Sequence, residues 1–230
     1  MGTLTYLRQV PSLFSGPVSR FPATVLSAVF HPLLVPSYLF YVVCYQLPGV
    51  LMQPALPERW LVLAVAGGFT LVLPALATGL LVYLGLADSV ELRAREQRAW
   101  PLLLAALSFG AAAWLLHRPA LFDALLFEMM AGMSLAVLLT FGITLRWKIS
   151  AHGVGMGGAL GLLGLLHLSG SAGLPGVWWL VGTAAVAGAV GSARLALSAH
   201  TPAQVWAGLA LGLGLVAGLG LGLSLGLSLG

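Results

Sequence analysis

The chain has 230 residues, of which 60% are hydrophobic and only 7% charged, and its mean hydropathy is +1.02. A soluble domain keeps roughly a quarter of its residues charged, so these values exclude a water-soluble globular protein and indicate a single membrane domain over residues 1–230. The net charge of +4 comes from ten basic and six acidic residues. The basic residues stand in short loops and form no patch, so we expect no nucleic-acid partner. Cys44 is the only cysteine, which excludes a disulfide framework and a thiolate metal site.

Residues 1–23 are predicted to be a polar, interfacial N-terminal segment rather than a cleavable signal peptide, because two arginines and three prolines interrupt them. Apolar segments follow at 24–47, 61–86, 101–116, 120–143, 152–170, 176–193 and 203–228. A membrane-spanning helix needs about 20 apolar residues, so we expect an all-α, polytopic transmembrane bundle of seven spans, with six as the alternative. Pro32, Pro36 and Pro74 fall inside expected helices, where neighbouring helices can satisfy the freed carbonyls.

Glycine is abundant in the C-terminal half of the chain. Gly153, Gly157, Gly161 and Gly164 recur at helical spacing, which predicts a smooth helix face for close approach of another helix. The same glycines leave a homo-oligomer open as an alternative. From residue 208 to 230, Gly or Ser alternates with Leu; we expect a helix there, since an isolated strand cannot satisfy its backbone in lipid.

The basic residues divide unevenly between the two faces of a seven-span bundle. One face carries Arg8, Arg20, Arg93, Arg95, Arg98, Arg146, Lys148 and Arg194, and the other carries Arg59 and Arg118. The positive-inside rule then places the first face in the cytoplasm, and we expect a multi-pass protein of the cell membrane, the bacterial cytoplasmic membrane. Alternatively, several of these residues bind one anion.

The first polar stretch that suggests an anion site begins at Lys148. Ser150 is a natural N-cap, and the free amides that follow it suit a phosphate. His152 lies in the first turn of that helix. A capped helix with an interfacial histidine explains this stretch equally well.

A second polar stretch runs from Arg194 to Gln204. Thr201-Pro202-Ala203-Gln204 matches a capping box with Pro at the first helical position. His200 is therefore held just outside a helix N-terminus, with Arg194 at the end of the preceding helix. A plain helix–turn–helix explains Gln204 but not the pairing of Arg194 with His200.

The third stretch, over 91–101, holds the main charged cluster. On a helix, Asp88, Glu91, Arg95 and Arg98 fall on one face at spacings of three and four. A salt-bridged interfacial helix is the simpler interpretation of this stretch taken alone.

Together the three stretches resemble the motifs of the type-2 phosphatidic acid phosphatase superfamily. That family carries a basic residue followed by Arg-Pro, then Pro-Ser-Gly-His, then Ser-Arg, five residues, His, three residues and Asp. Arg95 and Arg98 with Pro101 are similar to a displaced first motif, 149–152 (Ile-Ser-Ala-His) to the second, and 193–204 to the third. The resemblance implies a core over 90–208 like that of vanadium chloroperoxidase and the phosphatidate phosphatases.

The resemblance also implies a site and a mechanism. His200 would attack phosphorus to form a phosphohistidine, His152 would protonate the leaving oxygen, and Gln204 would orient His200 where the family has Asp. The phosphate would be bound by Arg95, Arg98, Lys148, Ser150 and Arg194. We expect neither a metal nor another cofactor, and the substrate implied is a phospholipid or isoprenoid phosphate within the membrane lipids.

Two rivals stay open. One is a phosphotransferase on the same scaffold, and the other is a non-catalytic lipid-phosphate binder, which Gln204 favours because an amide cannot stabilise an imidazolium as a carboxylate does. Glu128 falls inside an apolar segment, where a carboxylate is a functional candidate by default, although a structural role is the alternative. His31 could approach the site or be a satisfied interhelical histidine.

Overall fold

The computed structural model describes residues 20–89 and 95–227, and side chains as far as Gly220. This part of the chain is helical and contains no strand, which confirms the all-α prediction. Glu91 and Arg93 lie outside the described residues. Six described helices are long and apolar enough to span a membrane: Leu56–Tyr83, Glu96–Leu116, Ala124–Thr144, Ala151–Leu168, Gly173–Ala196 and Pro202–Gly220. The structure therefore favours six spans over seven, by the length and composition of its helices.

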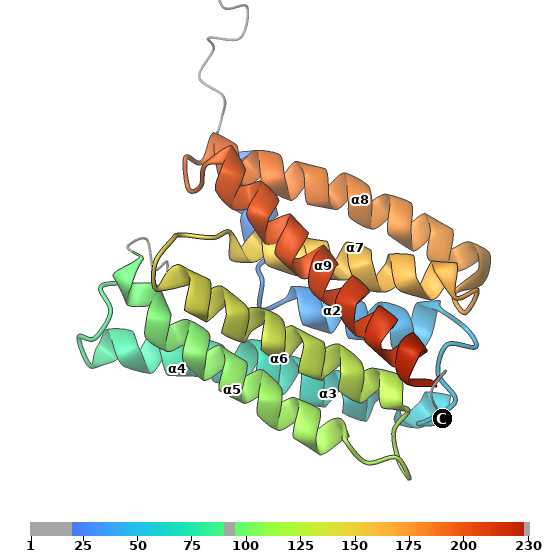
Figure 1. Cartoon of the computed structure of the whole chain (residues 1–230). Coiled ribbons are helices and arrows are strands. Elements are labelled where there is room, and N and C mark those ends of the chain that lie inside the picture. Colours follow the sequence, from blue (N-terminus) through green and yellow to red (C-terminus); the bar gives the residue numbers. More distant parts are fainter. Residues whose placement is uncertain (1–19, 90–94, 228–230) are drawn as a thin grey trace, which may run out of the picture.

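The helices form a bundle around one central helix, α7 (Ala151–Leu168) (Figure 1). Helix α9 (Pro202–Leu227) crosses α7 on one side, and α8 (Gly173–Ala196) packs on another. Helices α5 (Ala99–Leu116) and α6 (Ala124–Thr144) pair with each other further down in the view. A 3₁₀ turn at Glu96–Arg98 leads into α5, and another at Leu56–Glu58 begins the first span.

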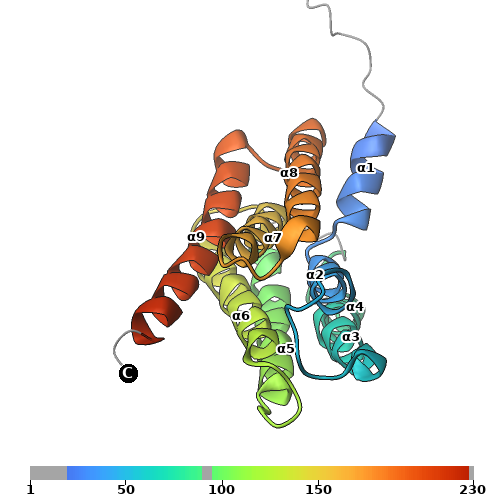
Figure 2. The same cartoon turned by 90° about the vertical axis from the view of Figure 1, so that its right-hand side faces the viewer.

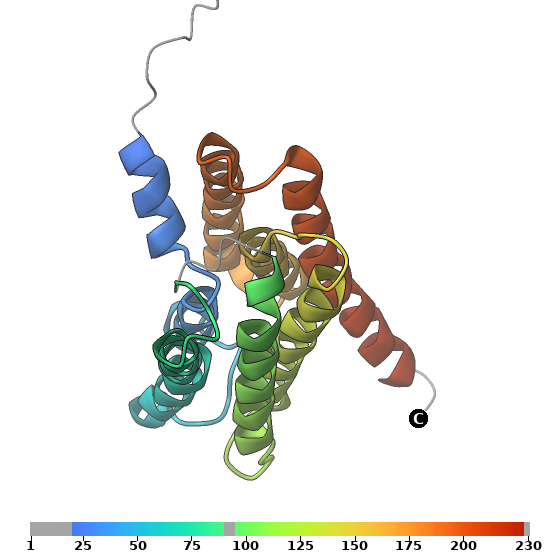
Figure 3. The ribbon, with the colours of Figure 1, turned by 90° about the vertical axis from the view of Figure 1, so that its left-hand side faces the viewer.

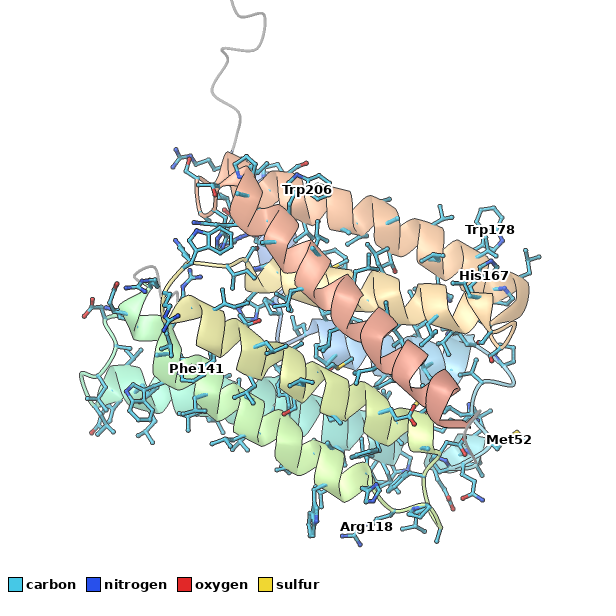
Figure 4. The ribbon with its side chains drawn as sticks, viewed as in Figure 1. Met52, Arg118, Phe141, His167, Trp178 and Trp206 are labelled. Atoms are coloured by element: carbon cyan, nitrogen blue, oxygen red, sulfur yellow. The ribbon has the colours of Figure 1, made fainter. Side chains whose placement is uncertain are left out.

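Different turns of the chain form the two ends of the bundle. At one end the chain turns from α6 into α7 and from α8 into α9, and Figure 3 looks onto this end. The turn between α7 and α8 lies at the other end, which faces the viewer in Figure 2. Trp206 lies near the first end, and Trp178 and His167 lie at the second (Figure 4). The exposed Trp206 and Trp178 side chains thus stand near helix ends, as an aromatic belt requires.

The prediction of one continuous helix over 24–47 is wrong. Helix α1 ends at Val29 (Arg20–Val29), and α2 begins at Val35 (Val35–Tyr41) and continues as a π-helical turn over Val42–Gln46. Pro32 has no N–H and its ring clashes with the carbonyl four residues earlier, which kinks or breaks a helix, and here the helix ends before it. The Leu33 N–H donates instead to His31 Nδ1 (3.3 Å), which closes the turn between the two helices.

The second apolar segment tolerates its proline as predicted. Helix α3 (Trp60–Gly67) passes through a π-helical turn (Gly68–Val72) into α4 (Leu73–Tyr83), with Pro74 in the first turn of α4. In a π-helical register the Phe69 carbonyl would accept from residue 74, which has no N–H. The Ser108 hydroxyl of α5 donates to that carbonyl instead. A neighbouring helix therefore satisfies the group that the proline leaves without a donor.

The glycines of α7 bring α9 into backbone contact. A Cβ added at Gly153 would lie 2.8 Å from the Val205 carbonyl oxygen, and one at Gly157 would overlap the backbone of Leu209. A Cβ added at Gly161 would lie 2.9 Å from Cβ of Val216 on α9. These distances confirm the close approach predicted for the three glycines. Gly164 is different: nothing lies within 4 Å of its Cβ position.

Candidate functional site

The N-termini of α7 and α9 lie side by side at the end shown in Figure 3. The Ser150 N–H donates to the Gln204 carbonyl (3.2 Å), which ties the two helix starts together. Such a bond requires close backbones, and Gly208 supplies the room, since a Cβ there would stand 2.5 Å from the Ser150 carbonyl oxygen. This packing sets His152 on α7 and His200 before α9 at the same end of the bundle.

The turn between α8 and α9 places His200 just before the start of α9. Ser198 has a positive φ of 52°, the conformation that usually needs glycine at the end of a helix. The Ala199 N–H donates to the Arg194 carbonyl (3.1 Å) and the Ser198 N–H to the Leu195 carbonyl (2.9 Å). These two bonds form a Schellman motif, which the sequence did not indicate because serine stands in place of glycine.

The capping box decides which ring nitrogen of His200 carries the proton. Gln204 N–H donates to Thr201 Oγ1 (3.4 Å), and Gln204 Oε1 accepts from the Thr201 N–H (3.2 Å). The same Oε1 lies 3.0 Å from His200 Nδ1. An amide oxygen only accepts, so Nδ1 carries the proton, and in the neutral ring the lone pair is on Nε2.

His152 is held by the N-terminal helix of the chain. Its Nε2 lies 3.0 Å from the Ser27 carbonyl oxygen of α1, and because a carbonyl can only accept, Nε2 carries a proton there. The ring is 8% exposed, the same fraction as His200. His152 also lies within electrostatic range of Arg194 and His200.

Three cations lie within electrostatic range of His200, which belongs to the turn outside the spans. The pKa of the His200 imidazole is lowered to about 4, first because the ring is buried, while the hydrogen bond to Gln204 opposes the shift. The charges that lower it further are those of Arg98, Arg194 and Lys148. We call Arg98, Lys148, Arg194, His152 and His200 the basic cluster.

The charges of two of these cations also act on Lys148. Its pKa is lowered, first by burial of the ammonium group and then by the charges of Arg98 and Arg194. Arg98 ends the 3₁₀ turn before α5 and Arg194 lies near the end of α8, so the two arginines are far apart in the sequence. Their charges reach both Lys148 and His200, and a group that gathers cations in this way suits an anion.

One donor of the cluster has no acceptor among the described residues. Arg194 Nε is buried and makes no hydrogen bond there. Unsatisfied buried donors are rare in folded proteins, and a guanidinium is a preferred partner of phosphate because it can form two parallel hydrogen bonds. Arg194 therefore retains donor capacity for an anionic ligand.

The structure does not bring every predicted phosphate ligand into the basic cluster. Arg95 donates to the Thr144 and Leu145 carbonyls at the end of α6 and forms an ion pair with Glu96 (3.2 Å). It stabilises a helix C-terminus. Ser150 is fully buried and its Oγ accepts from the Gly153 N–H (3.2 Å), which confirms the predicted N-cap. The Ser150 hydroxyl can still donate its proton in a hydrogen bond to a ligand.

His31 lies close to His152 of the basic cluster. Its ring centroid is 5.7 Å from that of His152, in an edge-on arrangement. Because His31 Nδ1 accepts from Leu33 N–H, its Nε2 is the protonated nitrogen in the neutral ring. The signal in the sequence was the pair His31-Pro32 inside an apolar segment, and the helix break at Pro32 is what moves His31 toward α7.

The arrangement combines an available imidazole lone pair with an anion-binding group of cations. Among residues 20–89 and 95–227, no three His, Cys, Asp or Glu side chains lie close enough to share a metal ion. An imidazole lone pair can act as a nucleophile, and cations beside it can stabilise an anionic group. Comparison of the chain with family models, with curated proteins and with solved structures finds no match in any of the three.

Proposed function

We propose that this protein is an integral membrane lipid phosphatase that hydrolyses a phosphate or pyrophosphate lipid through a phosphohistidine, without a metal ion. The observation that carries the proposal is the orientation of His200: Gln204 holds Nδ1–H, the lone pair remains on Nε2, and three cations lie within electrostatic range of the ring. An oriented nucleophile beside a cationic phosphate site is what phosphoryl transfer needs from a protein.

In the first step His200 Nε2 forms a bond to phosphorus while the bond from phosphorus to the lipid oxygen breaks. The electron pair of that bond goes to the leaving oxygen, which takes up a proton. Arg98, Lys148 and Arg194 stabilise the equatorial oxygens. In the second step a water oxygen attacks phosphorus and gives up a proton to Nδ1 of His152, the N–P bond breaks and its electrons return to Nε2 of His200, and phosphate leaves.

His152 is the proposed donor of the proton to the leaving oxygen. Its Nε2–H is held by the Ser27 carbonyl, so the proton would come from Nδ1 of the imidazolium form. The negative charge of a phosphate bound among cations favours that form by Coulomb attraction. His152→Ala would then slow esters with poor leaving groups more than esters with good ones.

The two rivals share the same basic cluster. A phosphotransferase would pass the phosphoryl group from His200 to an alcohol in place of water. A lipid-phosphate binder would use the cations alone, and the neutral Gln204 favours it because the amide does not stabilise an imidazolium. In all three cases we expect the substrate or ligand to be a lipid, since the basic cluster lies at one end of a bundle of six candidate spans.

The test is phosphate release by the purified protein from phosphatidate, lysophosphatidate, farnesyl phosphate and farnesyl pyrophosphate. We expect release from at least one of them, unchanged by a chelator. Release that stops with the chelator would contradict the metal-free mechanism. Transfer to an added alcohol at the expense of release would show the phosphotransferase, and saturable binding without release would show the binder.

Gln204 provides a separate test through the pH dependence of the rate. Gln204→Glu keeps the side-chain length and places a carboxylate beside His200, which should raise the His200 pKa from about 4 toward its ordinary value of 6.5. The nucleophile must be unprotonated, so activity is lost as the pH falls through this pKa. We expect the acid limb of kcat/KM near pH 4 in the wild type and more than one pH unit higher in Gln204→Glu.

Gln204→Met is the matched control, because it keeps the length and removes the acceptor. It should lower the rate at every pH, since nothing then holds Nδ1–H, and it should not move the acid limb upward. An acid limb at the same pH in the wild type and Gln204→Glu would show that His200 is not the titrating group.

A further inference from the structure

An apolar cavity of about 170 Å³ lies between helices α2, α5, α6, α7 and α9. Of the side chains that line it, only Glu128 and Thr140 are polar. The Thr140 hydroxyl donates to the Ala136 carbonyl of its own helix (2.7 Å) and needs no ligand. The lining is thus hydrocarbon except at Glu128, and apolar cavities of this kind bind apolar molecules rather than water.

The cavity is long and one end of it lies next to the basic cluster. Along α7 its lining runs from Ala151 to Leu165, which is about 21 Å at 1.5 Å per residue. Ala151 stands between Ser150 and His152, so this end adjoins the residues proposed to bind phosphate. Glu128 lies in the second turn of α6, about 18 Å along that helix from Thr140, and marks the far end.

The dimensions select the occupant. A dry apolar cavity of about 150 Å³ accepts one benzene ring, and this cavity spreads a similar volume of about 170 Å³ over a far greater length. A helix about 10 Å wide cannot enter such a space, nor can two acyl chains side by side. One extended hydrocarbon chain matches the length and the apolar lining of the cavity.

We propose that this cavity holds the hydrocarbon chain of the substrate, so that the protein acts on a phosphate ester with one chain inserted between α6 and α7. The inference rests on the proposed function for the position of the phosphate, because the chain extends from the basic cluster toward Glu128. Prenyl and monoacyl lipids both have the required chemistry.

Two glycines of α7 form a matched pair for the test. Gly158 lines the cavity, and nothing lies within 4 Å of its Cβ position. Gly164 is equally open but does not line the cavity. A leucine at Gly158 therefore fills the cavity, and a leucine at Gly164 makes the same change in helix propensity without filling it.

The first measurement compares long-chain and chain-free substrates. Gly158→Leu should raise KM for farnesyl phosphate and for lysophosphatidate at least tenfold and leave the hydrolysis of p-nitrophenyl phosphate unchanged. Gly164→Leu should change neither. Equal losses on all three substrates in Gly158→Leu, or the same result in both variants, would overturn the proposal. The lipid with the larger loss identifies the chain type.

The second measurement does not depend on catalysis. A long-chain alkyl phosphonate and the matching neutral alcohol, each with a diazirine at the chain end, are photolysed with the protein and the labelled residues are mapped. We expect labels on α6 and α7 near Glu128 in the wild type and Gly164→Leu, and none in Gly158→Leu. Labelling without any hydrolysis would leave the cavity assignment standing and contradict the phosphatase. Hydrolysis without labelling of the cavity would support the phosphatase and contradict the cavity assignment.

Discussion

Replacing His200 by alanine is expected to reduce phosphate release by a factor on the order of 10⁴ or more, because the substitution removes the nucleophile that forms the phosphoenzyme. The fold should persist. Gln204 Oε1 still accepts from the Thr201 N–H without the histidine, so the start of α9 keeps its capping box. Phosphate release from farnesyl phosphate and the thermal unfolding temperature of the purified variant together check this expectation.

His167→Ala is the control for that variant. His167 is an exposed histidine at the far end of the same bundle, beside Trp178 in Figure 4, and its removal should leave the rate unchanged. Trapping of acid-labile radioactive phosphate on the wild-type chain, and its absence in His200→Ala, would identify the intermediate. A His200→Ala variant that is folded and keeps full activity would eliminate the phosphohistidine mechanism.

Gly157→Ala is expected to lower the stability of the bundle strongly. The added methyl group would overlap the Leu209 carbonyl, a backbone group of α9 that cannot rotate away. Overpacking of this kind costs about 1–3 kcal/mol and occasionally more. Because the contact of α7 with α9 also sets His152 beside His200, phosphate release should fall together with the unfolding temperature.

Gly164→Ala in the same helix separates the steric effect from helix propensity. Nothing lies within 4 Å of its Cβ position, and alanine is a better helix former than glycine by about 1 kcal/mol. We expect unchanged or slightly higher stability and an unchanged rate. Equal unfolding temperatures for the two variants would mean that α7 and α9 do not pack through these glycines.

The sequence by itself determined that the protein belongs in a lipid bilayer and where most of its helices lie. Long apolar segments with few charges require a bilayer and helices, and the expected segments from 61 onward correspond to spans in the structure. Local rules also held: Ser150 caps α7, and Thr201 with Gln204 forms the capping box of α9. These features depend only on residues within one turn of each other, so a pattern along the chain is sufficient to predict them.

Only the tertiary structure decided which side chains from different helices lie together. Arg95 matched the spacing of a phosphate ligand as well as Arg98 did, yet its guanidinium reaches the end of α6, because the choice depends on which helix lies beside it. The break at Pro32 could not be distinguished in advance from the tolerated Pro74, since the outcome depends on a neighbour such as Ser108 that can donate to the freed carbonyl. The cavity under the basic cluster has no sequence signal at all, because it is a gap between five helices.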